Sequence, residues 1–247
     1  MLRQLSRTSF KRSIMNLDNK QASTTVLSHN QYSAPALLPA QASDLPDNPL
    51  ALFQEWFTKV LHPDSGVKEP EAVALSTVAL SPVPTPSTRF VLLKQADLNG
   101  LVFFSNYNSR KGKEIAENPY ASMAFYWKEL SLSVRAVGKV VKVEKDVTQQ
   151  YFASRPIGSR IGAYASPQSQ VLSSRDELSD RVKALEEKFG VDGGSTERKE
   201  KPEGEAKDLE APEYWGGYRL IPSEMEFWAG RANRFGHPLS FTILVLI

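Results

Sequence analysis

The stretch RFVLLKQADLNGLVFFSN, residues 89–106, predicts a β-hairpin and with it the class of the fold. Two runs rich in Val, Leu and Phe flank Asn99–Gly100, a dipeptide typical of tight turns between antiparallel strands. Further strand-like runs occur on both sides of this hairpin, at residues 72–80, 121–127, 131–144 and 214–230. Because consecutive strands have helices between only some of them, we expect a mainly β fold, an antiparallel barrel with helical additions.

Helical patterns occur at residues 47–61, 109–118, 146–154 and 173–190. Three of these have a recognisable start: Asp47 or Asn48 for the first, Ser109 for the second, and a capping box of Ser174 and Glu177 for the last.

The chain of 247 residues is long enough for one domain, which we place at residues 47–235. Residues 1–46 are polar and read as a flexible arm, and the basic, acid-free residues 1–14 fit either a mitochondrial transit peptide or a disordered basic tail. Residues 191–213 are charged and contain Gly and Pro, which predicts a disordered insertion, and residues 236–247 form a tail.

The composition excludes several classes of function. A formal net charge of +2 is too small for a typical nucleic-acid-binding protein. The absence of cysteine excludes disulfides and thiolate sites, and three widely separated histidines make a metal site unexpected. No apolar run is long enough for a membrane helix, so neither a membrane nor a nucleic acid is an expected partner.

Two pairs of cations are candidates for anion binding. Arg110 and Lys111 lie in the first turn of a predicted helix, where basic residues oppose the helix dipole unless an anion binds there. Arg89 and Lys94 lie five residues apart on a predicted strand, so a regular strand would point them to opposite faces. Surface positions without a ligand are the alternative for both pairs.

The segment YFASRPIGSRIGAYASPQSQ, residues 151–170, is a third candidate because it carries hydrogen-bond donors and arginines but no carboxylate. Tyr151, Arg155 and Ser159 follow one another at four-residue spacing, which would place them on one side of a helical turn. A solvated loop is the alternative. Two or three anion sites without a glycine-rich loop favour phosphorylated small molecules as ligands.

The chain resembles the pyridoxamine 5′-phosphate oxidases through motifs that match in order and spacing: RFVLLK, FFSNYNSRKGKEIAENP, YFASRPIGSRIGAYASPQSQ and EFWAG. Upstream, the resemblance extends through NPLALFQEWF and EPEAVALSTV. The likeness covers about residues 45–235. It implies a homodimeric split β-barrel that binds flavin mononucleotide (FMN) at the subunit interface.

The resemblance also implies roles for individual residues. The flavin contacts carry over onto Arg89, Phe90, Val91, Leu92, Leu93, Lys94, Phe104, Ser105, Arg110, Lys111, Gln168, Ser169 and Trp228, with Arg110 and Lys111 at the phosphate. The contacts to the substrate phosphate carry over onto Lys94, Tyr151, Arg155 and Ser159, and Arg234 matches the arginine that covers the substrate ring.

The chain departs from the family pattern at two places. Ser133 stands where the family has a glutamine that hydrogen-bonds the flavin. Beyond Arg234, Gly236 replaces a histidine and Pro238 replaces a flavin-contacting arginine, although His237 is a shifted substitute to consider. An alternative transcript or a gene-model error would explain such an ending.

The segment FTILVLI, residues 241–247, allows two outcomes for the barrel. The loss of the family's last strand would leave one barrel edge unpaired and prone to association. Alternatively, this apolar segment is itself a strand that pairs with the edge.

The resemblance predicts an enzyme that oxidises pyridoxamine or pyridoxine 5′-phosphate to pyridoxal 5′-phosphate with FMN and O₂, releasing H₂O₂. The altered ending allows an alternative, a split barrel that binds FMN or pyridoxal phosphate without turnover. A basic surface protein that binds anions nonspecifically is a third option. We expect a cytoplasmic location, with the basic N-terminus as an argument for mitochondria.

Overall fold

The predicted hairpin is present in the computed structural model, which describes residues 46–190, 209–230 and 241–244. Strands β2 (Thr85–Asp97) and β3 (Gly100–Asn106) are antiparallel, with Asp97 opposite Gly100. Gly100 has a φ of +139°, a conformation that side-chain-bearing residues rarely adopt. The register shifts between Leu93 and Gln95, so β2 is irregular at Lys94.

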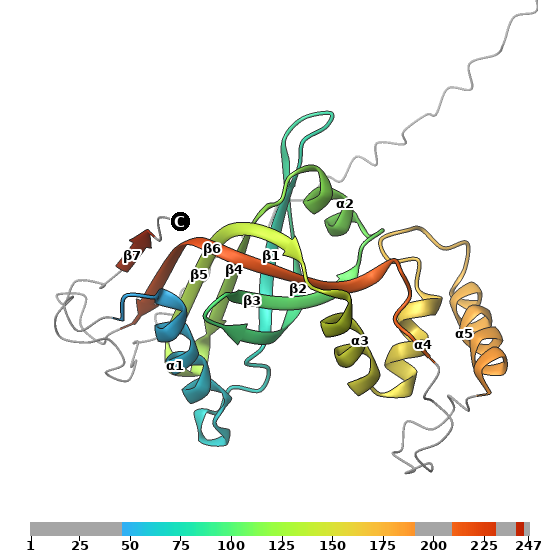
Figure 1. The fold of residues 1–247 in the computed structure, drawn as a ribbon, viewed down its shortest axis with the longest axis horizontal. Coiled ribbons are helices and arrows are strands. Elements are labelled where there is room, and N and C mark those ends of the chain that lie inside the picture. The colour runs from blue at the N-terminus through green and yellow to red at the C-terminus, as the bar shows by residue number, and fades with distance from the viewer. Residues whose placement is uncertain (1–45, 191–208, 231–240, 245–247) are drawn as a thin grey trace, which may run out of the picture. The chain divides into compact units, whose positions relative to one another are not determined.

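Six antiparallel strands form a closed barrel in the order β3-β2-β1-β4-β5-β6, because β6 also pairs with β3 (Figure 1). The mainly β fold expected from the sequence is thereby confirmed. The other strands of the barrel are β1 (Ala72–Ala79), β4 (Tyr120–Trp127), β5 (Leu132–Lys142) and β6 (Trp215–Ala229).

A seventh strand, β7 (Phe241–Leu244), pairs with β6 opposite Glu224–Phe227. Strand β3 pairs with the first part of β6, from Trp215 to Leu220, whereas β5 pairs with β6 from Tyr218 to Ala229. Strand β7 therefore occupies the edge of β6 that β3 leaves free. Of the two outcomes that the sequence allowed for this segment, the structure has the paired one over residues 241–244.

The barrel interior is packed with apolar side chains, and helix α1 (Pro49–Leu61) adds an aromatic face to it. Asn48 caps α1 by accepting a hydrogen bond from the backbone N–H of Leu50. The ring of Phe53 lies 5.1 Å from that of Phe125, and the ring of Trp56 lies 5.3 Å from that of Phe227. Helix α1 is thus fixed to the barrel by aromatic contacts.

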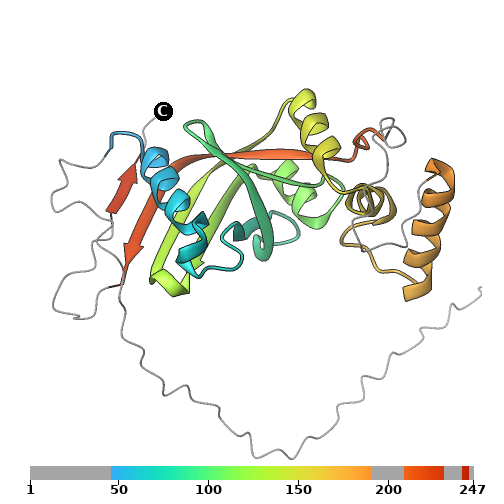
Figure 2. The same ribbon diagram turned by 90° about the horizontal axis from the view of Figure 1, so that it is seen from below.

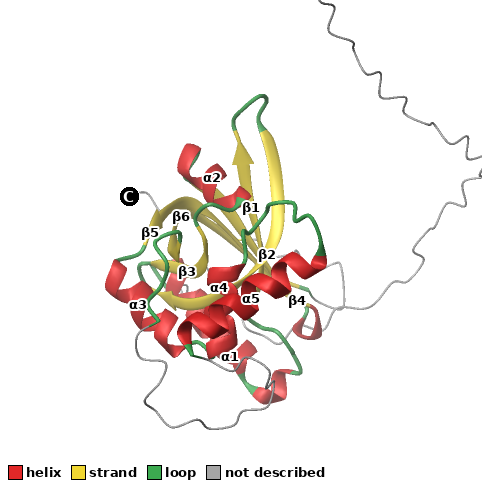
Figure 3. Ribbon diagram, turned by 90° about the vertical axis from the view of Figure 1, so that its right-hand side faces the viewer, coloured by secondary structure: helices red, strands yellow, loops and turns green. Residues whose placement is uncertain are grey.

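Three of the remaining helices lie on the side of the barrel away from α1. Figures 1 and 2 show α3, α4 and α5 gathered on the opposite side of the barrel from α1, and Figure 3 views the molecule from that side. A second apolar cluster, around Phe152, Ile161, Leu209 and Trp215, joins these helices to β6. The helices other than α1 are α2 (Arg110–Glu117), α3 (Lys145–Ser154), α4 (Ile157–Ala165) and α5 (Arg175–Phe189), with the short 3₁₀ helices η2 (Pro63–Ser65) and η3 (Lys128–Leu130).

Two helical expectations need correction. Helix α4 was not predicted as a separate element. The capping box of α5 is modified: Ser174 accepts from the N–H of Glu177, but the Glu177 carboxylate accepts from Ser173 instead of from the cap residue.

No helix in the described part of the chain is both long and apolar enough to span a bilayer. The N-terminal arm, most of the predicted insertion (191–208) and residues 231–240 lie outside the described residues. At the end of that insertion, Leu209 is described and buried.

Candidate functional site

The first part of the site is the start of α2, where the Lys111 side chain turns inward. Ser109 caps this helix by accepting a hydrogen bond from the N–H of Gly112, as the sequence predicted. The Lys111 Nζ donates to Ser105 Oγ at 3.0 Å, to Ser109 Oγ at 3.3 Å and to Gln168 Oε1 at 2.7 Å. Lys111 is only 7% exposed, so a buried ammonium is held by three neutral oxygens.

Burial and, after it, the positive charge of Arg89 lower the pKa of Lys111 to about 8, although the carboxylate of Glu114 acts in the opposite direction. A buried cation without an adjacent carboxylate is costly, and a bound anion would offset that cost. The environment of Lys111 would therefore suit a bound anion.

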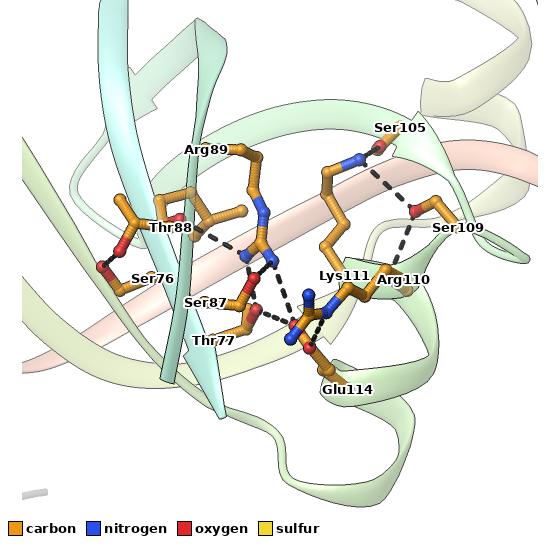
Figure 4. Close-up of polar contacts among 12 residues, drawn as sticks. Ser76, Thr77, Ser87, Thr88, Arg89, Ser105, Ser109, Arg110, Lys111 and Glu114 are labelled. Carbon is orange, nitrogen blue, oxygen red and sulfur yellow. Dashed lines mark hydrogen bonds and ion pairs between the residues drawn. The ribbon is translucent and has the colours of Figure 1, made fainter. Parts of the chain in front are cut away.

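The second part of the site surrounds Arg89 on β2 (Figure 4). Its Nη1 donates to Thr77 Oγ1, and its Nη2 donates to Ser87 Oγ at 2.7 Å and to Glu114 Oε2 at 3.1 Å. Thr77, on β1, is completely buried and also donates to Glu114 Oε2. The guanidinium of Arg89 is therefore fixed between two strands and α2.

Arg110 lies on the outer side of the same carboxylate. Its Nε donates to Glu114 Oε1 at 2.8 Å, and its side chain is 58% exposed. Beside it is a hollow of about 430 Å³, whose lining includes Asn108, Arg110, Glu114 and Ser169. The two adjacent cations of α2 thus point differently: Lys111 is buried and Arg110 borders an open hollow.

The third part of the site is a stack of aromatic rings where β3, α3 and β6 meet. The rings of Phe104 and Tyr151 stack at 3.9 Å, and that of Trp215 lies 5.6 Å from Phe104 and nearly parallel to Tyr151. The Arg155 guanidinium lies 4.8 Å from the centre of the Trp215 ring, within cation–π distance.

Arg155 is the second candidate anion-binding group. Its Nη1 is buried and has no hydrogen-bond partner among the described residues. Burial lowers the pKa of this guanidinium, and burial raises the pKa of the neighbouring Tyr151 hydroxyl. An orphaned buried donor of this kind suits a ligand oxygen.

The expected helical turn through Tyr151, Arg155 and Ser159 is wrong. Tyr151 belongs to α3, Arg155 ends that helix in an extended conformation, and Ser159 belongs to α4. The physical reason is Pro156, which disfavours the helical conformation for the residue before it.

The structure brings many of the predicted residues together. Lys111, Ser105 and Gln168 form one hydrogen-bonded group, and Arg89 and Arg110 share Glu114. Phe104 of the aromatic stack precedes Ser105 of the Lys111 group on β3, so the two groups are on consecutive residues of one strand. Ser169 follows Gln168 in a left-handed conformation, with φ of 67°.

Other predicted site residues do not belong to these groups, or they lie outside the described residues. Lys94 and Ser159 are exposed, and their side chains make no hydrogen bond or ion pair within the described part of the chain. Trp228 lies on β6 directly opposite Ser133 on β5. Arg234, together with Gly236, His237 and Pro238, lies outside the described residues.

The predicted residues of β2 divide between its two faces. Val91 and Leu93 face the barrel interior, with Leu93 buried. Phe90 is 77% exposed and Leu92 is 45% exposed, and Lys94 is exposed with them. Arg89 and Lys94 therefore lie on opposite faces, as expected for residues five apart on a strand.

Sequence reasoning missed Thr77, Ser87, Glu114 and Trp215. Glu114 carried a usable signal, because it lies four residues after Arg110 on a predicted helix. Thr77, Ser87 and Trp215 carried no such signal, because only the folded chain brings them to the site.

Two family models match the chain: "Pyridoxamine 5'-phosphate oxidase" over residues 64–189, and "Pyridoxine 5'-phosphate oxidase C-terminal dimerisation region" over residues 215–242. The pyridoxine/pyridoxamine 5'-phosphate oxidase of Pseudomonas fluorescens is 41% identical over 212 residues, which are 86% of this chain and 89% of that protein. Its namesake in Burkholderia mallei is 45% identical over 201 residues, with 81% and 85% coverage.

Solved structures agree with this fold. PhzG from Burkholderia lata, in complex with tetrahydrophenazine-1-carboxylic acid, has a TM-score of 0.69 at 27% identity and covers 87% of this chain and 100% of its own. A pyridoxamine 5'-phosphate oxidase-related, FMN-binding protein from Nostoc punctiforme has a TM-score of 0.54 at 12% identity, covering 78% and 97%, and supports the split-barrel fold alone.

Proposed function

The chain belongs to the pyridoxamine 5'-phosphate oxidase family, and from this premise we propose that it oxidises pyridoxamine or pyridoxine 5′-phosphate to pyridoxal 5′-phosphate, with FMN as cofactor and O₂ as electron acceptor. The observation that carries the proposal is the pairing of two anion-binding groups: the buried Lys111 ammonium and the orphaned Arg155 Nη1. One suits the phosphate of a flavin and the other the phosphate of a substrate.

The residues at the start of α2 fit the FMN phosphate. Lys111 and Arg110 would neutralise it, and the N–H groups of the first helical turn would donate to it. Ser105, Gln168 and Ser169 would hold the cofactor beside them, with Trp228 and the strand Arg89–Lys94 as further contacts. Bound FMN would supply the two-electron oxidation of the substrate's C4′ alcohol to an aldehyde, or of its C4′ amine to an imine that water hydrolyses to the aldehyde and ammonia, with the electrons passed to O₂ to give H₂O₂.

For the substrate we propose that Arg155 binds the phosphate, with Tyr151, Ser159 and Lys94 as further donors. The Trp215 ring beneath the guanidinium and the Phe104 ring beneath Tyr151 fix the directions of both donors. Arg234 would cover the substrate ring, as the family resemblance implies. The main task of these residues is to orient two ligands and to balance two phosphates.

We further propose that the protein works as a homodimer. A model of a dimerisation region matches residues 215–242, which supports this assembly. The outer face of β2, β1 and β4 also exposes large apolar side chains, including Phe90 at 77% and Tyr126 at 60%. Apolar side chains gathered on one sheet face are typical of a protein interface.

The experiment that tests the function is purification followed by two measurements. A flavin absorbance spectrum, with one FMN per chain after denaturation, would support cofactor binding. Oxygen uptake and pyridoxal 5′-phosphate formation with pyridoxine 5′-phosphate would support the reaction. A colourless protein that cannot be loaded with FMN would refute the proposal.

A second candidate function is flavin or pyridoxal-phosphate binding without turnover. The observation that favours it is Ser133, which lies opposite Trp228 where the family has a longer, flavin-bonding glutamine. Stoichiometric FMN without oxygen uptake would support this candidate over the oxidase.

A further inference from the structure

Glu114 is the buried carboxylate in the middle of the cations of the phosphate site. It is 4% exposed, although it lies on a short surface helix. Its Oε2 accepts from Thr77 Oγ1 and from Arg89 Nη2 at 3.1 Å, and its Oε1 accepts from Arg110 Nε at 2.8 Å (Figure 4). Each oxygen therefore holds a different arginine.

The two arginines come from different elements of the fold. Arg89 is on β2 and Arg110 is on α2, and the contact shared by both guanidinium groups is the carboxylate of Glu114. Burial acts to raise the pKa of Glu114, but the hydrogen bonds from Thr77, Arg110 and Arg89 outweigh it and hold the pKa below its usual value. Glu114 is therefore ionised at neutral pH.

We propose that Glu114 is a positioning residue for phosphate recognition: its carboxylate fixes the directions of the Arg89 and Arg110 guanidinium groups, which together with the Lys111 ammonium receive the phosphate of FMN. This inference rests on the proposed function. Glu114 does not touch the phosphate, because its two oxygens already accept from the hydroxyl and the arginines.

The charges of the site agree with this role. Three cations and one carboxylate leave a net charge of +2, which matches a phosphate monoester of nearly two negative charges at neutral pH. Without the carboxylate, like charges on Arg89, Arg110 and Lys111 would repel one another in a partly buried place. The arginines would then lose their fixed directions before the ligand arrives, which weakens recognition.

Glu114 also supports the charge of Lys111. The groups that face the Lys111 ammonium are Ser105 of β3, Ser109 and Gln168, which are neutral, and the charged groups near it are Arg89 of β2 and Glu114 of α2. Removing the negative charge of Glu114 would lower the pKa of Lys111 further. Phosphate binding should then weaken at a lower pH than in the unchanged protein.

The test compares FMN with riboflavin, which has the same ring system and no phosphate. Dissociation constants are measured by flavin fluorescence quenching for the unchanged protein, Glu114→Gln and Glu117→Gln, between pH 6.5 and 9. Glu117→Gln removes the same charge from an exposed position of α2 at the edge of the same hollow, so it controls for the loss of one negative charge near the site without loss of the contacts to the arginines. For Glu114→Gln we expect FMN affinity to fall about tenfold at pH 8 while riboflavin affinity stays within about twofold.

Three results for Glu114→Gln would overturn the inference. Equal losses for FMN and riboflavin would mean a structural role, unchanged FMN affinity would mean no role, and tighter FMN binding would mean that Glu114 competes with the phosphate for the arginines. If Glu114→Gln does not fold, Thr77→Val replaces it, because it removes the hydroxyl that links Glu114 to Arg89 and should give a smaller, still phosphate-selective loss.

The unchanged protein separates this inference from the proposed function. If it prefers FMN over riboflavin, the phosphate site stands and only the variants decide the role of Glu114. If it binds both flavins equally, neither the phosphate site nor the role of Glu114 survives, and if it binds neither, the proposed function also fails.

Discussion

Replacing Arg155 by alanine should weaken phosphorylated substrates while leaving the stability of the protein nearly unchanged. The guanidinium lies 4.8 Å from the Trp215 ring centre, and its Nη1 is buried without a partner among the described residues. The substitution removes a buried unsatisfied donor, which costs roughly 1–3 kcal/mol, and a cation–π contact worth roughly 0.5–2 kcal/mol. These two changes oppose each other, so the free energy of unfolding should change by no more than about 1 kcal/mol.

The effect on the reaction should be much larger. A charge-assisted hydrogen bond to a phosphate contributes roughly 1.5–3 kcal/mol, which corresponds to a roughly 10- to 150-fold loss in kcat/KM. The assay compares pyridoxine 5′-phosphate with unphosphorylated pyridoxine for the unchanged protein, Arg155→Ala and Arg175→Ala, which removes an exposed arginine from α5. Urea unfolding of each variant without ligands gives the stability.

Two results would refute this reasoning about Arg155. Equal losses for both substrates would show that the residue does not recognise the phosphate. A loss of more than about 2 kcal/mol in unfolding free energy would show that its main role is structural.

Four other predictions follow from the site and the barrel. Arg110→Ala combined with Lys111→Ala should abolish FMN retention, and unchanged flavin stoichiometry after gel filtration would contradict this. Because burial lowers the pKa of Lys111 from 10.5 to about 8, the Kd for FMN should rise as the pH passes 8, and a constant Kd from pH 7 to 9 would argue against the assignment. Between pH 8 and 10.5 Lys111 is protonated in the unfolded chain and largely deprotonated in the folded one. Lys111 therefore makes the ligand-free protein more stable as the pH rises through this range. Replacing the residues after Asn233 by the family's usual ending should raise turnover and flavin content. Solubility should not change, because β7 already pairs with β6. Equal turnover in the two proteins would contradict this prediction. Gly138→Ala should destabilise the protein by at least about 2 kcal/mol, because the new Cβ would lie 2.0 Å from the backbone oxygen of Ile221 on β6. Gly158→Ala, which adds a Cβ in open space on α4, should be neutral or stabilising in the same urea unfolding assay.

The barrel strands were predictable because each has a local signal. The turn at Asn99–Gly100 and the alternation along β5 are examples that short windows of sequence contain. The pairing of β6 with β3 and β7 has no local signal, because it joins segments far apart in the chain. Helix α4 was missed because the segment after Arg155 was interpreted as one continuous turn or a loop.

The candidate site was predictable in its charges but not in its partners. The sequence indicated an anion site at Arg110 and Lys111, yet only the packing of α2 determines that Lys111 is the buried one. Glu114 looked like an ordinary helix residue, although it holds two arginines. Arg155 and Trp215 are sixty residues apart in the sequence, so their contact comes from the fold alone.

The double pairing of β6 has a consequence for how the molecule forms. The strands from β1 to β5 pair largely with near neighbours in the chain, whereas β6 must pair Leu220 with Leu101 to complete the ring. Pairings between distant segments are slow because the chain between them loses entropy first. We therefore expect the part of the proposed cofactor site that lies on β1, β2, β3 and α2 to assemble early in biosynthesis, before Gln168 and Trp228 join it. The part proposed to bind the substrate has to wait for β6, which brings Trp215 to Phe104 and Arg155.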